Sequence, residues 1–151
     1  MASRDRRTAR WWRSSGRRPI VVARKLPGSS DGDSRATCGA KAEAAAGKHL
    51  VANGLSILDR NVRCRLGEID IVARDGACVV FVEVRMRASQ RFGGALASVD
   101  SHKQRRLVAT ARWYLGRHPK LANEPCRFDV MGVASNDGAI TWLRDAFRVD
   151  G

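Results

Sequence analysis

Acidic side chains interrupt two apolar segments in the middle of the chain. Glu68 and Asp70 lie in GEIDIVAR (67–74), and Glu83 lies in CVVFVEVRMR (78–87). Side chains alternate between the two faces of a strand, so all three carboxylates are expected on one face of the two strands. Carboxylates that face each other destabilise paired strands, so this arrangement requires a compensating partner.

A divalent cation is one such partner. Mg²⁺ prefers hard oxygen ligands, usually one or two carboxylates completed by waters and substrate phosphate. Asp70 and Glu83 could hold it while it activates water and polarises a phosphodiester. The residues leave a second interpretation open, a solvated sheet edge on which arginines neutralise the acids. Those arginines are Arg63, Arg65, Arg85 and Arg87.

The turn between the two segments predicts how they pair. Asp75-Gly76 is a strong signal for a two-residue hairpin turn. Such a turn places Glu68 opposite Glu83 and Asp70 opposite Phe81. The other face of the hairpin is then apolar. Its expected members are Ile69, Ile71, Ala73, Val80, Val82 and Val84.

Sequence periodicity predicts the elements that position these residues. An alanine-rich segment with a glycine stop favours a first helix, and helical apolar spacing before Pro119 favours a second. Alternating segments bounded by turn residues favour strands. The expected elements are a helix at 37–53, strands at 55–65, 67–74 and 78–87, a helix at 99–115, and strands at 128–134 and 139–147. The order α-β-β-β-α-β-β indicates the α/β class, with a central mixed sheet flanked by helices.

The charge is spread unevenly. Among 151 residues, 28 Lys and Arg face 15 Asp and Glu, which gives a net charge of +13. Residues 1–35 hold ten of the basic residues against three aspartates, so we expect a disordered basic tail followed by one domain at 36–151. An organellar transit peptide, or a start codon placed too far upstream, would also account for the tail. The positive charge favours a polyanionic partner, most often nucleic acid.

Composition disfavours several classes of protein. No apolar run approaches the roughly 20 residues that span a bilayer, so a membrane protein is not expected. A zinc site is not expected either, because the cysteines form no CxxC pair and the histidines add no ligand spacing. Cys64 and Cys78 lie in strand-like segments and are expected as reduced thiols. A cytoplasmic location is therefore predicted.

A basic segment opens the second predicted helix. Candidate contacts to nucleic-acid phosphates are Lys103, Gln104, Arg105, Arg106 and, on the preceding strand, Arg87. Lys103 or Gln104 could instead reach the acidic site, and a solvated basic turn is the alternative for any one of the helix residues. The aromatic residues expected in the core or at its edge are Trp113, Tyr114 and Trp142.

Five ordered motifs closely resemble those of the YraN-type family of small bacterial endonuclease-like proteins. They are GEIDIVARDG (67–76), VFVEVRMR (80–87), FGG (92–94), KQRRL (103–107) and RFDV (127–130). The resemblance covers residues 37–148. The family is placed by fold with the PD-(D/E)xK nucleases, so the resemblance implies a restriction-endonuclease-like fold and an endonuclease-like domain at 36–151.

The resemblance also implies roles for single residues. Asp70 corresponds to the superfamily's aspartate, Glu83 to the acidic residue of its ExK motif, and Glu43 to a helix glutamate that completes the metal site in some members. The implied ion is Mg²⁺ or Mn²⁺, and Glu68 is expected to support the site without binding it. Arg85 occupies the position of the superfamily lysine. Arginine keeps its charge and cannot act as a base, although its donors could hold a phosphate.

Two functions are consistent with these residues. The first is a metal-dependent endonuclease acting on branched or single-stranded DNA, with Asp70, Glu83, Arg85 and Glu43 as its catalytic residues. The second is a nucleic-acid-binding module of the same fold with weak or absent catalysis, which Arg85 favours. DNA is favoured over RNA in both. A basic protein of membrane surfaces or ribosomes is a third class, and it would not need the acidic pair.

Overall fold

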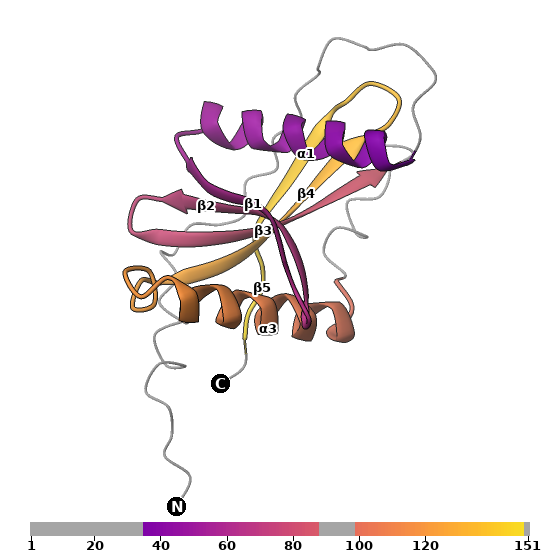
Figure 1. Ribbon diagram of the computed structural model, residues 1–151. Coiled ribbons are helices and arrows are strands. Elements are labelled where there is room, and N and C mark those ends of the chain that lie inside the picture. Colours follow the sequence, from indigo (N-terminus) through magenta and orange to yellow (C-terminus); the bar gives the residue numbers. More distant parts are fainter. Residues whose placement is uncertain (1–34, 88–98, 150–151) are drawn as a thin grey trace, which may run out of the picture.

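The computed structural model describes residues 35–87 and 99–149 (Figure 1). Its elements are α1 (Arg35–Ala52), β1 (Ser56–Cys64), β2 (Gly67–Asp75), β3 (Cys78–Arg87), α3 (Ser101–Arg117), β4 (Cys126–Ala134) and β5 (Ile140–Phe147). This order confirms the prediction from periodicity. Residues 1–34 of the predicted tail and the glycine-containing segment Gly93-Gly94 lie outside the described residues, whereas Arg35, which was predicted in the tail, begins α1. No helix in the described part of the chain is long and apolar enough to cross a bilayer, and the cytoplasmic location stays a prediction.

Within the described residues the strands form a five-stranded mixed sheet in the order β1-β2-β3-β4-β5. Neighbouring strands are antiparallel except β3 and β4, which run parallel from Val79↔Cys126 to Arg87↔Ala134. Parallel neighbours need a crossover connection, and α3 lies in that connection. The sheet lies between α1 on one face and α3 on the other (Figure 1). The predicted α/β class with a flanked central sheet is therefore confirmed.

Each helix buries one apolar face against its side of the sheet. On the α1 side, Ala46 and Leu50 pack in a cluster with Val82 and Trp142. On the α3 side, the cluster joins Leu107, Ala111, Tyr114 and Leu115 to strand residues that include Val72, Val79, Phe81 and Phe128. Aromatic stacking adds to the second cluster, because the Phe81 and Phe128 rings lie 5.5 Å apart. Each face of the sheet is thus covered by one helix and buried in one apolar cluster.

The pairing of β2 with β3 differs from the sequence prediction. The last residues to pair are Asp75 and Cys78, so Gly76 and Ala77 form the turn and the predicted Asp75-Gly76 turn is wrong. Gly76 has φ 59°, which suits a glycine in a tight turn. Asp75 stays in the strand because its Oδ2 accepts a 2.8 Å hydrogen bond from Arg127 Nη1 on β4. The predicted facing pairs change accordingly, and Phe81 pairs with Val72 instead of Asp70.

The predicted apolar face is also wrong at one residue. Ile69 packs in the α3-side cluster, whereas Ile71 and Ala73 pack on the α1 side. Strict alternation assumes a regular ladder, but the described β2–β3 pairing begins at Ile71↔Val82. The neighbouring strand β1 is irregular as well, because Asn61 has φ 50°. The side chains of β2 before and after Asp70 therefore do not follow one regular alternation between the two faces of the sheet.

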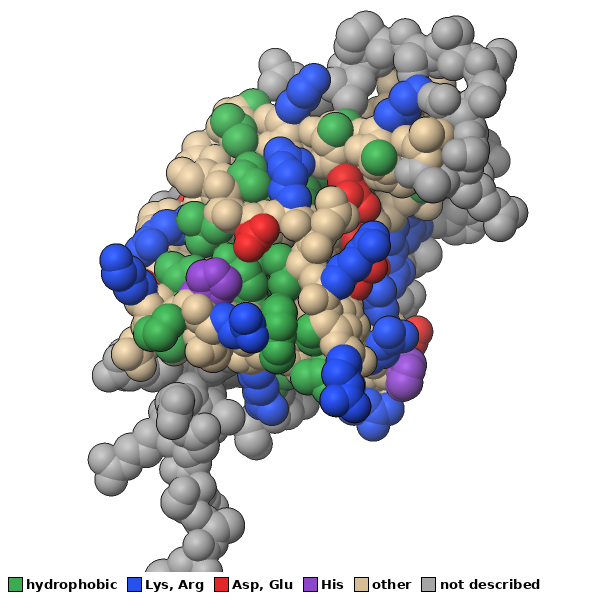
Figure 2. Space-filling model, viewed as in Figure 1, with side chains coloured by type: hydrophobic (Ala, Val, Ile, Leu, Met, Phe, Trp, Pro, Cys, Tyr) green, Lys and Arg blue, Asp and Glu red, His purple; other side chains and the backbone are tan. Residues whose placement is uncertain are grey.

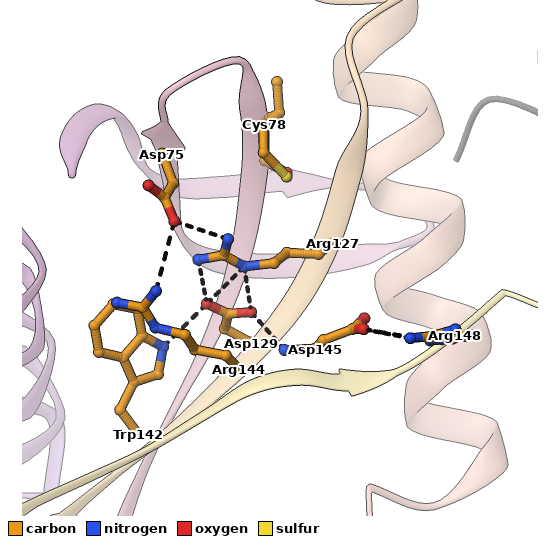
Figure 3. Close-up of polar contacts among 9 residues, drawn as sticks. Asp75, Cys78, Arg127, Asp129, Trp142, Arg144, Asp145 and Arg148 are labelled. Carbon is orange, nitrogen blue, oxygen red and sulfur yellow. Dashed lines mark hydrogen bonds and ion pairs between the residues drawn. The ribbon is translucent and has the colours of Figure 1, made fainter. Parts of the chain in front are cut away.

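A buried polar network ties β4 and β5 to the end of the β2–β3 hairpin (Figure 3). Asp129 is 1% exposed, and its carboxylate accepts hydrogen bonds from Arg127 Nε at 3.0 Å, Trp142 Nε1 at 3.0 Å and the Asp145 N–H at 2.9 Å. Asp145 has φ 51° and lies where the β4–β5 register shifts. Arg127 extends the network to Asp75. One carboxylate thus fixes both the irregular part of β5 and the hairpin.

Removing this carboxylate should destabilise the fold strongly. Asp129→Asn leaves the buried Arg127 charge without its main partner, so the free energy of unfolding should fall by about 3–5 kcal/mol. Arg148→Ala is the control, because it removes the more exposed pair with Asp145 and should cost less than about 1 kcal/mol. Urea unfolding measures both changes, and losses of equal size would contradict this account of the network.

Candidate functional site

Asp70 lies at the point where the described β2–β3 ladder ends. Its side chain is buried at 9% residue exposure, and its Oδ2 accepts a 2.7 Å hydrogen bond from the backbone N–H of Val84 on β3. A carboxylate therefore satisfies a β3 donor that a regular ladder would direct to a backbone carbonyl. This contact fixes the Asp70 side chain between the two strands.

Glu83 precedes Val84 on β3 and is also buried, with 9% exposure. Its Oε1 lies 3.2 Å from Nζ of Lys103, which comes from the first turn of α3. The helix start fixes Lys103, because the Asp100 carboxylate caps α3 by accepting the Lys103 N–H at 2.8 Å. The pair joins two elements on either side of the segment 88–98.

Three further carboxylates lie near enough to Asp70 to raise its pKa. Burial raises its pKa to about 7 from an ordinary 3.8, the Val84 hydrogen bond opposes this rise, and repulsion from Glu83, Glu43 and Glu68 adds to it. Glu43 comes from α1 and Glu68 from β2, so three elements contribute negative charge. Figure 2 shows acidic side chains among more numerous Lys and Arg side chains on the face in view. Asp70 is thus a carboxyl group that takes up a proton near neutral pH.

Asp70 and Glu83 suit a small oxygen-liganded cation that needs only two carboxylate ligands from the protein. No group of three or more His, Cys, Asp and Glu side chains that could hold a metal ion occurs in residues 35–87 and 99–149. Asp70 and Glu83 match the one or two carboxylates with which proteins usually hold Mg²⁺, because waters complete its shell. The structure places Glu43 near enough to raise the pKa of Asp70, and its role as a third ligand stays a prediction.

Arg85 and Arg87 continue β3 beyond Glu83 and are half-buried. The pKa of Arg87 is lowered by burial and by the like charge of Arg85. Arg85 also contributes, after the Lys103 backbone hydrogen bond and other causes, to the lowered pKa of Asp100. Positive charge is therefore concentrated between the end of β3 and the start of α3. The cation paired with Glu83, however, is Lys103.

The other predicted residues take separate positions. Gln104 Nε2 donates a 2.7 Å hydrogen bond to the Val99 carbonyl and so anchors the approach to α3. Arg105 and Arg106 are exposed on the helix. Of the aromatic residues, Tyr114 and Trp142 lie in the core as predicted, but Trp113 is 37% exposed and lies outside it. The roles of Gln104, Arg105 and Arg106 in binding nucleic acid stay predictions.

The prediction that Lys103 or Gln104 could reach the acidic site is confirmed for Lys103, which pairs with Glu83, and not for Gln104. The signal was present, since Asp100 three residues before Lys103 is a typical helix-capping arrangement. A cap fixes where the helix starts, but it does not say which strand the helix start faces. That information comes from the crossover between β3 and β4.

The fold and the position of the acidic pair define a class. An α/β domain with the order α-β-β-β-α-β-β, carrying Asp70 on its second strand and Glu83 on its third, belongs with the PD-(D/E)xK nuclease-like folds. Residues 42–133 match the uncharacterised protein family UPF0102, which is the YraN-type family. The chain belongs to this family.

Relatives of high identity support the assignment. A UPF0102 protein of Nitrosococcus oceani is 51% identical over 114 residues, which cover 74% of this chain and 92% of the relative. One of Alcanivorax borkumensis is 48% identical over 117 residues, covering 76% and 94%. One of Xanthomonas euvesicatoria is 51% identical over 112 residues, covering 74% and 92%. The chain is similar to these proteins over nearly their whole length.

The raised pKa of Asp70 predicts a stability that falls as pH rises. The folded protein holds this proton more tightly than the unfolded chain, so the free energy of unfolding should decrease between pH 3.8 and about 7. Asp70→Asn keeps an oxygen for the Val84 N–H and removes the charge. It should therefore be more stable than wild type at pH 8, by at most about 4 kcal/mol, and similar to it at pH 4.

Urea unfolding at pH 4, 6 and 8 measures this difference. The matched control is Asp59→Asn, which removes a carboxylate from an exposed position of β1. If Asp70→Asn and Asp59→Asn change stability equally at every pH, the proposed desolvation of Asp70 is contradicted.

Proposed function

We propose that this protein is a metal-dependent endonuclease that cleaves phosphodiester bonds in DNA. The observation that carries the proposal is the meeting of a buried, hydrogen-bonded Asp70 with Glu83 and Lys103. A purely structural role would be served better by an apolar contact, because burying carboxylates near one another costs folding energy. A buried carboxyl group with a raised pKa, such as Asp70, is typical of functional sites.

Each residue has a distinct part in the proposed chemistry. Asp70 and Glu83 would hold Mg²⁺ or Mn²⁺, with Glu43 close by. The bound ion would supply the Lewis acidity that activates water and neutralises charge on the phosphate. Lys103 pairs with Glu83 and places a compact ammonium charge beside the site, which differs in shape and donor geometry from the guanidinium fork of an arginine. Arg85 keeps a fixed positive charge for the phosphate.

Lys103 offsets the departure that Arg85 introduces. Arginine in the position of the superfamily lysine removes a titratable amine from β3. Lys103, on α3, instead places its amine 3.2 Å from the Glu83 carboxylate. This contact favours an active enzyme over a chain that has lost catalysis.

The proposed substrate is single-stranded or branched DNA. The domain at 36–151 is small and offers little surface for reading a base sequence, whereas its positive charge suits the phosphate backbone. A substrate chosen by structure is consistent with both features.

Cleavage assays test the proposal directly. The full chain with Mg²⁺ or Mn²⁺ should cut single-stranded or branched DNA, and Asp70→Ala and Glu83→Ala should each lower the rate at least about 100-fold. Lys103→Ala should lower it by about 10²–10³, as expected for the loss of one preorganised charge. Asp59→Ala is the control and should cut like wild type. Cleavage that survives the double change Asp70→Ala and Glu83→Ala would overturn the proposal.

A second candidate function is a nucleic-acid-binding module without effective catalysis. Arg85 is the observation that favours it, since the expected lysine is absent from β3. Binding would then depend on phosphate contacts alone and would fall steeply with salt.

Arg85→Lys separates the two candidates. If the native site is active with Lys103 as its amine, Arg85→Lys should reduce cleavage, since the fixed donor fork is lost. If catalysis has been lost, the same change should create or increase cleavage by restoring the ExK lysine. Steady-state cleavage of one oligonucleotide by both forms measures the direction, with unfolding curves as a check on folding.

A further inference from the structure

Helix α3 carries positive charge without any negative side chain. Ser101–Arg117 contains no Asp or Glu, and its basic residues are Lys103, Arg105, Arg106, Arg112 and Arg117. One face of the helix is buried through Leu107, Ala111 and Tyr114. The exposed remainder is therefore cationic along the full length of the helix, which is complementary to a polyanion.

An aromatic side chain lies within this charged surface. Trp113 is 37% exposed, and the guanidinium carbon of Arg117 lies 5.1 Å from its ring centroid. A cation over the ring restrains its orientation. The core does not require this tryptophan, because the α3-side cluster is built from other residues.

Helical geometry aligns this tryptophan with the candidate site. Trp113 follows Arg106 by seven residues and precedes Arg117 by four, so these three residues lie along one side of α3. We call them the α3 stripe. Lys103 lies three residues before Arg106 on the adjoining side and contacts Glu83. The stripe therefore leads along the helix, over about 20 Å, toward the acidic pair.

The β1–β2 turn supports the end of the stripe nearest the site. A Cβ added at Gly67 would lie 3.4 Å from Arg106 Cβ and 3.0 Å from Thr110 Oγ1, so α3 packs closely on the start of β2. Arg65 in that turn is exposed. The cationic surface thus continues from α3 onto the turn.

We propose that the α3 stripe binds a single strand of nucleic acid, with Trp113 stacked on an unpaired base and Arg106 and Arg117 on neighbouring phosphates. Bases stack on exposed aromatic rings and guanidinium planes, and basic side chains follow the backbone. Bases inside a duplex are already stacked on each other and do not offer a free face. The stripe therefore selects unpaired strands, and it deepens the proposed function, on which it rests, by assigning the surface that recognises the unpaired strand.

The test is binding of the full chain to a labelled dT20 strand and to a labelled blunt 20-base-pair duplex. Fluorescence anisotropy, with EDTA present, measures the binding. Trp113→Ala should weaken binding to dT20 about tenfold and change duplex binding less than twofold. Trp113→Phe keeps a ring and should retain most of the affinity. Val51→Ala, which truncates an exposed apolar residue on α1, is the control and should change neither.

Salt dependence tests the arginines separately. For a single strand, the slope of log K against log salt should fall in magnitude by about 0.7 in Arg106→Ala. Thermal unfolding shows whether each variant remains folded. Unchanged dT20 affinity in folded Trp113→Ala, or equal losses on dT20 and duplex, would overturn the proposal.

These outcomes are independent of catalysis, since EDTA removes any bound divalent cation. If wild type never cuts DNA but Trp113→Ala loses dT20 binding selectively, the proposed endonuclease fails and the α3 stripe stands. If wild type cuts DNA and Trp113→Ala binds dT20 normally, the α3 stripe fails and the proposed endonuclease stands.

Discussion

A buried carboxylate that accepts a backbone hydrogen bond from the neighbouring strand is the constraint on which the candidate site depends. Asp70 Oδ2 holds the Val84 N–H at 2.7 Å where the described β2–β3 ladder ends. This places Glu83, the residue before Val84, beside Asp70. The cost is a desolvated acid among like charges, which raises the pKa of Asp70 to about 7. The fold maintains this unfavourable group, and a function is the simplest reason for it.

The rest of the structure compensates for this local cost. The parallel pairing of β3 with β4 requires the crossover that carries α3, and the cap of α3 brings Lys103 to Glu83. At the other end of the hairpin, Asp129 and Arg127 hold Asp75 and the irregular part of β5. Two apolar layers, one under each helix, secure the strands between these polar contacts. The acidic site is thus supported from both ends of the sheet.

Local patterns were sufficient to predict the elements and the acidic candidates. The bounds of β3 agree with the prediction, and the order of helices and strands follows from periodicity and turn residues. The turn register could not be predicted, because Asp75 is held in β2 by Arg127, which lies 52 residues later. Ile69 changes face because the ladder is irregular near Asp70, and alternation carries no information about that.

Contacts between distant segments explain the remaining differences. The Lys103–Glu83 pair depends on how α3 crosses the sheet, and charge alone cannot show which face of α3 meets β3. Trp113 was expected near the core because it is large and apolar, yet Leu107, Ala111 and Tyr114 already fill the buried face of α3. The strand pattern and the family resemblance both predicted Asp70 and Glu83, whereas the structure shows that Lys103, and not Gln104, contacts the Glu83 carboxylate.

Proton release on metal binding tests the central claim most directly. Isothermal titration of the full chain with Mg²⁺ at pH 7, in buffers of different ionisation enthalpy, measures the protons released per ion bound. Because the pKa of Asp70 is raised to about 7, a fraction of the Asp70 carboxyl groups is protonated at pH 7, and we expect Mg²⁺ binding to release protons at pH 7 and almost none at pH 9. Binding without proton release at pH 7, or equal binding to Asp70→Asn, would contradict it.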